Sequence, residues 1–421
     1  MDGYVKRERY LQKLIDRRDN GDVKIITGPR RSGKSFLLKT IYRDYLVSQG
    51  VPPENIIIVS LDEDDENNQS ELADKELLKT HIYKRILSNE SNYYVFLDEI
   101  QEIDGFEKVV NGLNAKENID VYITGSNSHL LSSDINTIFR GRGDEVHVEP
   151  FCFKEFCEGR TEPKNELWKE FYTYGGLPAL RKRKTPQQKI AYLHRLWEKT
   201  YIADVVERHR IKNTLALDAL VDQLCSSVGS FSNPNNISNT LLSVQHCKVD
   251  AETVSTYIGY LEDAYLFRGS RRYNIKGKRY YESLKKKYYC TDIGLRNARL
   301  NFRQQEITHI MENVIYNELC SRGYLVDVGM IESRELVNGK QEYRQYEVDF
   351  IATDGMRKYY IQSAYSIPDE DKLGQELKSF RKIDDSFQKI VIVGDDIATY
   401  TNDEGIIFMG LMQFLENEAI L

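Results

Sequence analysis

The apolar residues of the first 150 positions fall into five short runs, which polar or amphipathic stretches separate. The runs are residues 23–28, 55–64, 92–100, 120–128 and 144–150. Each run has the length of a strand, and the runs that begin at residues 23, 92 and 120 have the apolar character of buried strands. After the first run, apolar residues recur at helical spacing as far as Gly50: Phe36, Leu37, Ile41, Tyr45 and Leu46. Strands that alternate with helices predict a mostly parallel sheet, so we expect one α/β domain over residues 1–150.

The pattern becomes helical between residues 151 and 215. It is interrupted at residues 174–178, whose sequence is YGGLP. Two glycines and a proline are typical of a tight joint between helices. We therefore expect a helical lid or linker in this part of the chain.

Residues 216–290 show a third pattern. A short helix is predicted over residues 237–244, and a longer one over 250–267 has an apolar side formed by Val254, Tyr257, Ile258, Leu261 and Leu266. Residues 268–290 are predicted to form a β-hairpin with Gly277 at its turn. The order of helix, turn, helix and wing predicts a small winged-helix module of the kind that binds DNA.

The overall composition is that of an ordinary soluble protein, with 41% hydrophobic residues, 29% charged residues and a formal net charge of -7. Any nucleic-acid contact must therefore come from a local patch. The length of 421 residues predicts two or three domains. The six scattered cysteines indicate reduced, mostly structural thiols. The start of the chain lacks the apolar core of a signal peptide, and no stretch approaches the ~18 apolar residues of a membrane span, so we expect a cytoplasmic protein with no membrane partner.

A local basic patch lies within the predicted hairpin. Nine basic residues accompany a single acid, Glu282, and tyrosines are interleaved among them. The basic residues are Arg268, Arg271, Arg272, Lys276, Lys278, Arg279, Lys285, Lys286 and Lys287. Because phosphate contacts by lysine and arginine dominate non-specific affinity for nucleic acid, we expect DNA to be a partner. The candidate contacts are Arg271, Arg272, Lys278 and Arg279. The alternative is that this module packs the first domain against the last one and never meets DNA.

A glycine-rich motif connects the first predicted strand to the first predicted helix. Gly28, Gly33, Lys34 and Ser35 have the spacing G-x-x-x-x-G-K-S, and a strand, a loop and a helix in this order are the expected context of a P-loop. The backbone N–H groups of such a loop close around phosphates, lysine reaches the β- and γ-phosphates, and the serine hydroxyl binds Mg²⁺. We therefore expect ATP and Mg²⁺ as ligands. The candidate ATP-binding residues are Gly28, Pro29, Arg30, Arg31, Ser32, Gly33, Lys34, Ser35 and Phe36.

Polar side chains follow two further predicted strands. Asp98 and Glu99 end the strand at residues 92–100, where the first acid can hold Mg²⁺ through its water and the second can polarise the attacking water. This pair favours hydrolysis over binding alone, with Glu99 as the catalytic base. Ser126 or Asn127, after the strand that begins at residue 120, is placed to contact the γ-phosphate or the water. The alternative for the TGSN segment is a simple turn.

Motifs that recur in a known family run through nearly the whole chain. They are TGPRRSGKS, FLDEIQEI, ITGSNSHLL, FRGRGDEVHVEPFCFKEF, YGGLPAL, YYCTDIGLRNA, MENVIYNELCSRGYLVDVG, YEVDFIA and YYIQSAY. On these motifs the sequence resembles the prokaryotic AAA-type P-loop ATPases that carry a winged-helix segment and a C-terminal domain related to the PD-(D/E)xK nucleases. The resemblance implies that ATP lies at a subunit edge, as in a homo-oligomer. An arginine from a neighbour or from a moving segment then completes the charge stabilisation. Of Arg140 and Arg142 the resemblance favours Arg142, which precedes the last core strand; the alternative for each is a solvated loop arginine.

The resemblance also implies a restriction-endonuclease-like α/β domain over residues 291–421. A working site of that class needs a helix glutamate, a strand aspartate and an E-x-K on the next strand, which hold Mg²⁺ and activate water. Glu312 opens a predicted helix and Asp349 begins a predicted strand, but Gln362 stands in place of the acid and Ala364 in place of the lysine. We therefore expect a domain that keeps the fold with a vestigial site and does not cleave nucleic acid. Binding of nucleic acid or of a partner protein stays open.

These patterns together predict an ATP hydrolase whose turnover drives or gates a conformational change in a DNA-associated module. One alternative is a nucleotide-dependent switch that assembles on a protein partner and hydrolyses ATP slowly. Another is a defence nuclease. ATP turnover with and without DNA separates the first two possibilities, and metal-dependent cleavage tests the third.

Overall fold

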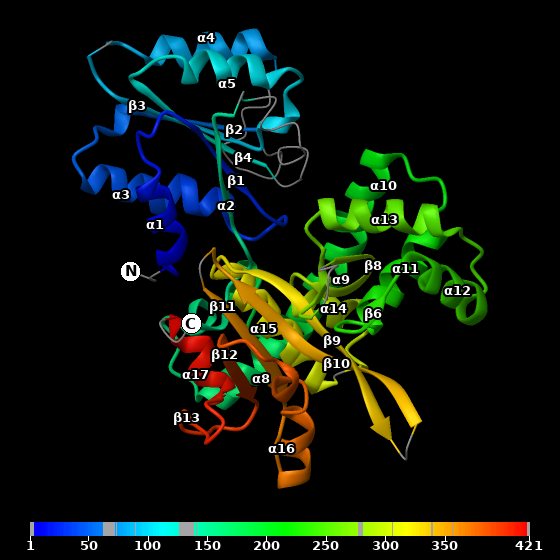
Figure 1. Cartoon of the computed structure of the whole chain (residues 1–421). Helices are drawn as coiled ribbons and strands as arrows, with labels where there is room; N and C mark the ends of the chain where they lie inside the picture. Colours follow the sequence, from blue (N-terminus) through cyan, green and yellow to red (C-terminus); the bar gives the residue numbers. More distant parts are fainter. Residues whose placement is uncertain are drawn as a thin grey trace. The chain divides into compact units, whose positions relative to one another are not determined.

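A computed structural model describes residues 4–61, 72, 74–88, 90–125, 139, 141–276, 281–304, 306–337, 340–355 and 357–418 (Figure 1). The chain divides into two compact units. The first consists of Met1–Pro150 with Asp263–Tyr265, and the second consists of Phe151–Glu262 with Leu266–Leu421. Each unit is built around its own β-sheet.

The first unit has a five-stranded sheet in which all strands are parallel. The strands are β1 (Val23–Thr27), β2 (Ile56–Ser60), β3 (Tyr93–Asp98), β4 (Ile119–Thr124) and β5 (Gly143–His147). Their order in the sheet is β2-β3-β4-β1-β5. The five apolar runs are thus confirmed as strands, and the prediction of a parallel α/β sheet is correct.

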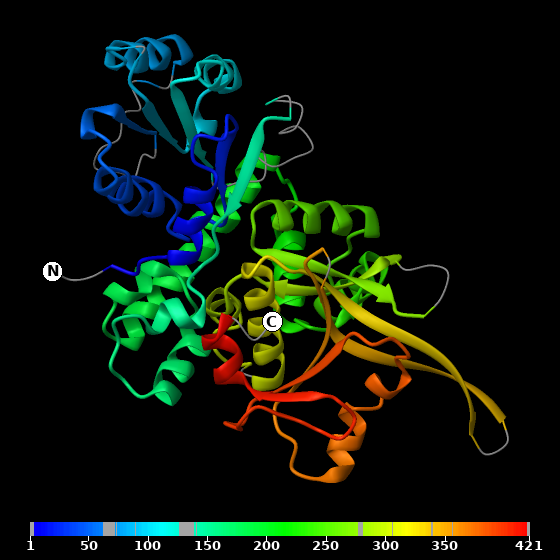
Figure 2. The same cartoon turned by 60° about the vertical axis from the view of Figure 1, so that its left-hand side comes forward.

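Helices cover both faces of this sheet (Figure 2). They are α1 (Glu8–Asp16), α2 (Lys34–Phe36), a π-helical turn (Leu37–Tyr42), α3 (Arg43–Ser48), α4 (Lys75–Arg85) and α5 (Phe106–Asn114), with short 3₁₀ turns at Pro53–Asn55 and Ile100–Glu102. Alternate residues of β3 enter separate cores: Val95 and Leu97 pack with α4 and α5, whereas Tyr94 and Phe96 pack with α1 and the helix after β1. This burial on both faces explains why the strand is apolar throughout.

The second unit begins with helices. They are α7 (Phe153–Cys157), α8 (Lys164–Tyr174), a 3₁₀ turn (Pro178–Lys182), α9 (Pro186–Leu196), a π-helical turn (Trp197–Ile202) and α10 (Ala203–His209). The joint predicted at residues 174–178 lies between α8 and the 3₁₀ turn. Gly175 has a φ of +81°, and a Cβ there would lie 2.2 Å from a carboxylate oxygen of Asp292. The Gly176 N–H donates to the same carboxylate at 2.7 Å, so the glycines are required by a close contact.

The next elements match the predicted helices and hairpin closely. They are α11 (Thr214–Ser226), β6 (Phe231–Ser232), α12 (Pro234–Gln245), α13 (Ala251–Asp263), β7 (Phe267–Asn274) and β8 (Tyr281–Cys290). β7 and β8 are antiparallel, and the short β6 pairs with β8. The longer helix ends at Asp263, earlier than predicted, because β7 already begins at Phe267. The predicted turn residue Gly277 lies outside the described residues.

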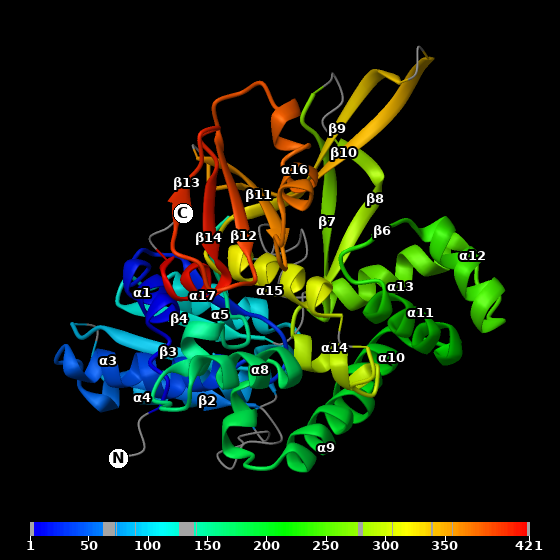
Figure 3. The same cartoon turned by 90° about the horizontal axis from the view of Figure 1, so that it is seen from below.

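The remaining elements extend the same sheet. They are α14 (Ile293–Arg299), α15 (Ile307–Ser321), β9 (Leu325–Val337), β10 (Lys340–Thr353), β11 (Lys358–Ala364), α16 (Glu370–Glu376), a 3₁₀ turn (Phe380–Lys382), β12 (Gln388–Val393), β13 (Tyr400–Thr401), β14 (Ile407–Gly410) and α17 (Leu411–Glu416). The sheet has nine strands in the order β13-β14-β12-β11-β10-β9-β7-β8-β6, and α15 packs against β8 to β11 (Figure 3). The boundary expected at residue 290 therefore falls inside one compact unit.

Candidate functional site

The glycine-rich loop (residues 28–33) begins where β1 ends, at the carboxyl edge of the parallel sheet. Gly28 has a φ of +133°, and a Cβ at this position would lie 2.2 Å from the Val148 carbonyl oxygen. Gly33 has a φ of +97° and immediately precedes the helix that starts at Lys34. Both glycines of the motif are thus required by backbone geometry, and they direct the loop onto the start of the helix.

Lys34 points back into this loop. Its side chain is buried, and its ammonium donates to the carbonyl oxygens of Gly28 at 3.0 Å and Pro29 at 3.1 Å. The positive charge is therefore held at the centre of the loop, where phosphates are expected to bind.

Arg7 supports the loop from the N-terminal segment. Its guanidinium donates to the Ser32 carbonyl oxygen at 3.0 Å and to the Glu149 carbonyl oxygen at 2.7 Å, and it lies over the ring of Tyr10. The side chain is buried. No sequence pattern singled out Arg7, because its partners lie 25 and 142 positions away.

Asp98 is the centre of a polar cluster beside the loop. Its carboxylate is fully buried and accepts hydrogen bonds from the hydroxyls of Ser35 at 2.9 Å and Thr124 at 2.5 Å. The Lys39 ammonium lies 2.7 Å from the second carboxylate oxygen. Ser35 and Asp98 were predicted to act together, and the structure brings them into contact. Thr124 and Lys39 were missed, although Lys39 follows Ser35 by one helical turn.

Glu99 follows Asp98 at the end of β3 with a left-handed φ of +54°. Its backbone N–H donates to the Thr124 hydroxyl at 3.0 Å, and its carboxylate accepts from the Gln101 amide at 2.5 Å. Thr124 therefore contacts both acids and fixes the turn that separates their side chains. The predicted sensors Ser126 and Asn127 come just after β4 and lie outside the described residues.

Phe36 is exposed at the start of the helix after the loop. Its ring forms an edge-to-face contact with the ring of Tyr4, with 5.4 Å between centroids, and both side chains are nearly half exposed. The two rings form an exposed aromatic pair beside the glycine-rich loop.

Comparison with known proteins identifies the domain that carries these residues. An AAA-domain family matches residues 20–157, and a domain of unknown function matches residues 165–306. An uncharacterized protein of Haemophilus influenzae is 34% identical over 395 residues, which are 93% of each chain. The chain belongs to the family of this protein. A second relative, the uncharacterized protein MJ1544 of Methanocaldococcus jannaschii, is 31% identical over 399 residues, 91% of this chain and 83% of the relative.

Solved structures resemble the chain more weakly. The Cdc6p structure from Pyrobaculum aerophilum has a TM-score of 0.31 and 10% identity, covering 74% of this chain and 94% of that one. The structure of the Aeropyrum pernix Orc1 protein in complex with DNA has a TM-score of 0.28 and 11% identity, covering 70% and 92%. At these TM-scores, the likeness supports no conclusion about this chain. In the part of the chain that the structure describes, no helix is long and apolar enough to cross a membrane.

Arg142 lies at the opposite edge of the AAA domain's sheet from the glycine-rich loop. It is exposed and directly precedes β5, and its carbonyl oxygen accepts from the N–H of Val23, the first residue of β1. Because β1 and β5 are parallel, the five residues of β1, about 16 Å in length, separate Arg142 from the loop. Arg142 and the glycine-rich loop therefore lie at opposite ends of β1. Arg140 lies outside the described residues.

The basic residues of the hairpin have several different surroundings. Four of them pair with acids of the second unit: Arg272 with Glu332, Lys276 with Asp384, Lys286 with Glu262, and Lys287 with Glu312 and Glu347. Arg272 and Lys287 are buried, whereas DNA contact by the hairpin stays a prediction. Arg271 is exposed, and neither it nor Lys285 forms an ion pair with a described residue. Lys278 and Arg279 lie outside the described residues.

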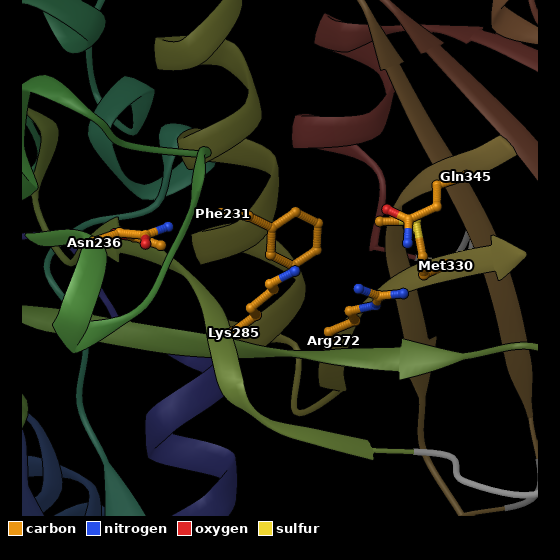
Figure 4. A pocket seen from close by; sticks show the side chains of 7 residues that line it. Phe231, Asn236, Arg272, Lys285, Met330 and Gln345 are labelled. Carbon is orange, nitrogen blue, oxygen red and sulfur yellow. The ribbon is translucent and has the colours of Figure 1, made fainter. Parts of the chain in front are cut away.

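A pocket of about 240 Å³ opens beside the hairpin (Figure 4). It is lined by Phe231, Ser232, Asn236, Arg272, Lys285, Met330 and Gln345. Lys285 and Arg272 project from β8 and β7 toward the space that Phe231 also faces (Figure 4).

The acids of the expected vestigial nuclease site lie near Lys287. Its ammonium is 2.9 Å from a Glu312 carboxylate oxygen and 2.5 Å from a Glu347 carboxylate oxygen, and the Tyr289 hydroxyl donates to Glu312 at 2.7 Å. Asp349 is buried and accepts from the Ser363 N–H at 2.8 Å. We call Glu312, Glu347 and Asp349 the carboxylate cluster. Gln362 follows Ile361, which pairs with Phe350, so it lies on the strand next to Asp349.

Proposed function

We propose that the chain is an ATP hydrolase whose turnover drives a conformational change in the second unit. The observation that carries this proposal is the contact between Ser35 and Asp98, with Glu99 next to them. These residues come from the helix after the glycine-rich loop and from the carboxyl end of β3. In an AAA domain this arrangement would put a metal-binding hydroxyl, a metal-binding carboxylate and a base beside the same phosphates.

The glycine-rich loop would bind the phosphates of ATP. A triphosphate would offer the Lys34 ammonium charged acceptors, which form stronger hydrogen bonds than the carbonyl oxygens of Gly28 and Pro29 that now accept from it. The backbone N–H groups at the helix start add positive potential. The exposed rings of Tyr4 and Phe36 are suited to contact the base.

The side chains next to the loop fit Mg²⁺. It prefers oxygen ligands and is usually bound by one or two carboxylates together with substrate phosphates and waters. The Ser35 hydroxyl and the Asp98 carboxylate supply oxygens of this kind. Bound there, the ion would neutralise charge on the β- and γ-phosphates. The Lys39 ammonium holds Asp98 from its other side, so the carboxylate stays oriented.

Glu99 is the proposed general base. Its carboxylate is held by the Gln101 amide, and its backbone by the Thr124 hydroxyl, so its position is defined by two contacts. A carboxylate positioned within reach of a water can accept its proton as the water attacks the γ-phosphate.

Two substitutions test this assignment. Glu99→Gln is expected to bind ATP and to lose nearly all hydrolysis, because a carboxamide can hydrogen-bond but is a poor base. Lys34→Ala is expected to weaken ATP binding itself. Glu102→Gln, three residues further on, is the matched control. ATP affinity is measured with a fluorescent nucleotide and turnover by phosphate release. Unchanged turnover in Glu99→Gln rejects the base, and tight ATP binding by Lys34→Ala rejects the phosphate loop.

The position of Arg142 favours a second candidate, a nucleotide-dependent switch with slow hydrolysis in the isolated chain. Arg142 is exposed at the edge of the sheet away from the loop, so it would complete the site of a neighbouring subunit only after assembly. An arginine supplied in this way raises the rate by ~10³ to 10⁵. Assembly-dependent hydrolysis predicts that turnover per subunit rises steeply with protein concentration. It also predicts that turnover falls to the basal rate in Arg142→Ala. A rate independent of concentration rejects it.

We further propose that the hairpin region is a winged-helix module that contacts nucleic acid. The order α11, β6, α12, α13, β7 and β8, with β6 paired to β8, supports the winged-helix assignment. The exposed Arg271 and the Lys285 side chain in the pocket support a phosphate contact. The proposed conformational change would link this contact to ATP turnover. Turnover measured with duplex, with single-stranded and with no DNA tests the coupling, and three equal rates reject it.

A further inference from the structure

Lys287 occupies the centre of the carboxylate cluster formed by Glu312, Glu347 and Asp349. Its side chain is only 4% exposed, and its ammonium contacts Glu312 and Glu347 directly. The three acids come from α15 and β10, whereas Lys287 comes from β8. The backbone also accommodates the cluster, because a Cβ on Gly229, which has a φ of +74°, would lie 3.0 Å from a Glu312 carboxylate oxygen.

Electrostatics keep this ammonium charged. Burial alone would lower the pKa of Lys287, but the Glu312, Asp349 and Glu347 carboxylates together raise it above its ordinary value. Burial and the neighbouring Glu312 charge raise the pKa of Asp349 well above its usual range. The Tyr289 hydroxyl holds Glu312, and Phe231 places its ring 5.7 Å from the ammonium. The lysine is therefore the positive partner of the buried Asp349 and of the partly exposed Glu312 and Glu347.

The cluster has the carboxylates of a divalent-metal site, but the Lys287 ammonium lies where a metal ion would bind. Carboxylates of a helix glutamate and of strand acids are ligands that Mg²⁺ or Mn²⁺ prefers. The ammonium lies between the Glu312 and Glu347 carboxylates. Among the described residues, no group of three or more metal-ligating side chains is arranged to hold a metal ion. The residues present thus do not fit a metal in this arrangement.

We infer that the Lys287 ammonium is a built-in cation that takes the place of a divalent metal in this cluster. It joins β8 to α15 and β10 by charge and prevents metal from binding. This inference does not depend on the proposed ATPase, since every contact lies within the second unit. It implies that removal of the lysine charge alone converts the cluster into a site for a hard divalent cation.

The test compares Lys287→Met with Lys286→Met in the full-length, nucleotide-free protein. Lys286 is the next residue of β8 and pairs with Glu262, outside the cluster, so its variant also loses one ion pair. In EDTA, Lys287→Met should lower the Tm by about 6 °C or more, because breaking a buried pair leaves uncompensated charges. Mn²⁺ should then raise its Tm by about 5 °C at 100 times its Kd. Wild type and Lys286→Met should show no such shift.

A second substitution identifies the metal ligands. Lys287→Met combined with Glu312→Gln should lose the Mn²⁺-dependent Tm shift. The absence of that shift in Lys287→Met alone would overturn the inference.

A measurement on protein that retains Lys287 covers the case in which Lys287→Met does not fold. Mn²⁺ binding by nucleotide-free wild type, followed by electron paramagnetic resonance, should be the same in Glu312→Gln. Loss of a bound Mn²⁺ in Glu312→Gln would show that metal and lysine occupy the cluster together, which overturns the inference. Mn²⁺-dependent DNA cleavage by wild type that Asp349→Ala abolishes would overturn it as well.

Discussion

Replacing Thr124 by valine should uncouple the two acids of the candidate ATP site. The Thr124 hydroxyl donates to Asp98 at 2.5 Å and accepts from the Glu99 N–H at 3.0 Å. Valine has nearly the same shape and fills the same buried position, so the substitution removes two hydrogen bonds without leaving a cavity. Any loss of stability or turnover should therefore come from the lost hydrogen bonds and not from altered packing.

The magnitude follows from these two bonds. A hydrogen bond to a charged group contributes about 1.5–3 kcal/mol, and a buried N–H left without an acceptor costs about 1–3 kcal/mol. The free energy of unfolding of the first unit should fall by about 2.5–6 kcal/mol. Glu99 lies in a left-handed turn that Thr124 holds, so its carboxylate should shift relative to bound ATP. A displacement near 1 Å costs up to about 100-fold in rate, so we expect a 10- to 100-fold loss of turnover.

Phosphate release and nucleotide binding are measured on Thr124→Val and on Thr124→Ser, which keeps the hydroxyl. ATP affinity should change little, because Lys34 and the glycine-rich loop are untouched. Thr124→Ser should be close to wild type in turnover and stability. A folded Thr124→Val protein that hydrolyses ATP at the wild-type rate would refute the role given to this hydroxyl.

Three further predictions concern other parts of the chain. Burial raises the pKa of Asp292 to about 6 from its usual 3.8, so the wild-type protein loses stability as pH rises through this window. As the pH rises from 3.8 to about 6, the free energy of unfolding of Asp292→Asn, measured with urea, should increase by about 3 kcal/mol relative to that of wild type. A difference between the two proteins that does not change with pH contradicts this prediction. Arg7→Lys loses one of the two bonds to the carbonyl oxygens of Ser32 and Glu149. It should bind ATP about 10-fold more weakly, and unchanged affinity would exclude a role in loop support. Replacing Arg271 and Lys285 by alanine should reduce the slope of log binding constant against log salt concentration for duplex DNA by up to ~1.8, whereas Lys286→Ala should leave the slope unchanged. The same slope in the double variant and in wild type argues against the contact.

Local patterns predicted the first unit well. Strands β1 to β4 are buried because helices cover both faces of the sheet, and this burial is visible in sequence as mostly apolar runs, whereas the edge strand β5 is only partly buried. The loop motif fixes Gly28, Gly33, Lys34 and Ser35 by spacing alone. The supporting contacts could not be predicted in the same way. Thr124 reaches Asp98 because β4 lies next to β3, and strand order is not encoded in any single run.

The basic segment shows the limit of charge counting. Nine cations in twenty residues predicted a solvent-facing, phosphate-binding wing. In β8, however, neighbouring side chains point to opposite faces of the sheet. Lys287 consequently enters the buried carboxylate cluster, whereas Lys286 pairs with Glu262. The partner Glu312 lies 25 positions further along, on a helix whose packing against the sheet no local pattern specifies.

The parallel pairing of β7 with β9 has a consequence for how this chain can evolve. Arg272 to Asn274 pair with Val328 to Met330, so the hairpin and the strands after residue 290 share backbone hydrogen bonds. A recombination event between them would leave two open strand edges, which are templates for aggregation. Recombination can exchange a segment freely only where the strands of one sheet do not lie on both sides of the segment's boundary. The hairpin region and the C-terminal strands should therefore be inherited together as one block, and chimaeras of relatives joined at residue 290 should be soluble only where both parents supply matching strand edges.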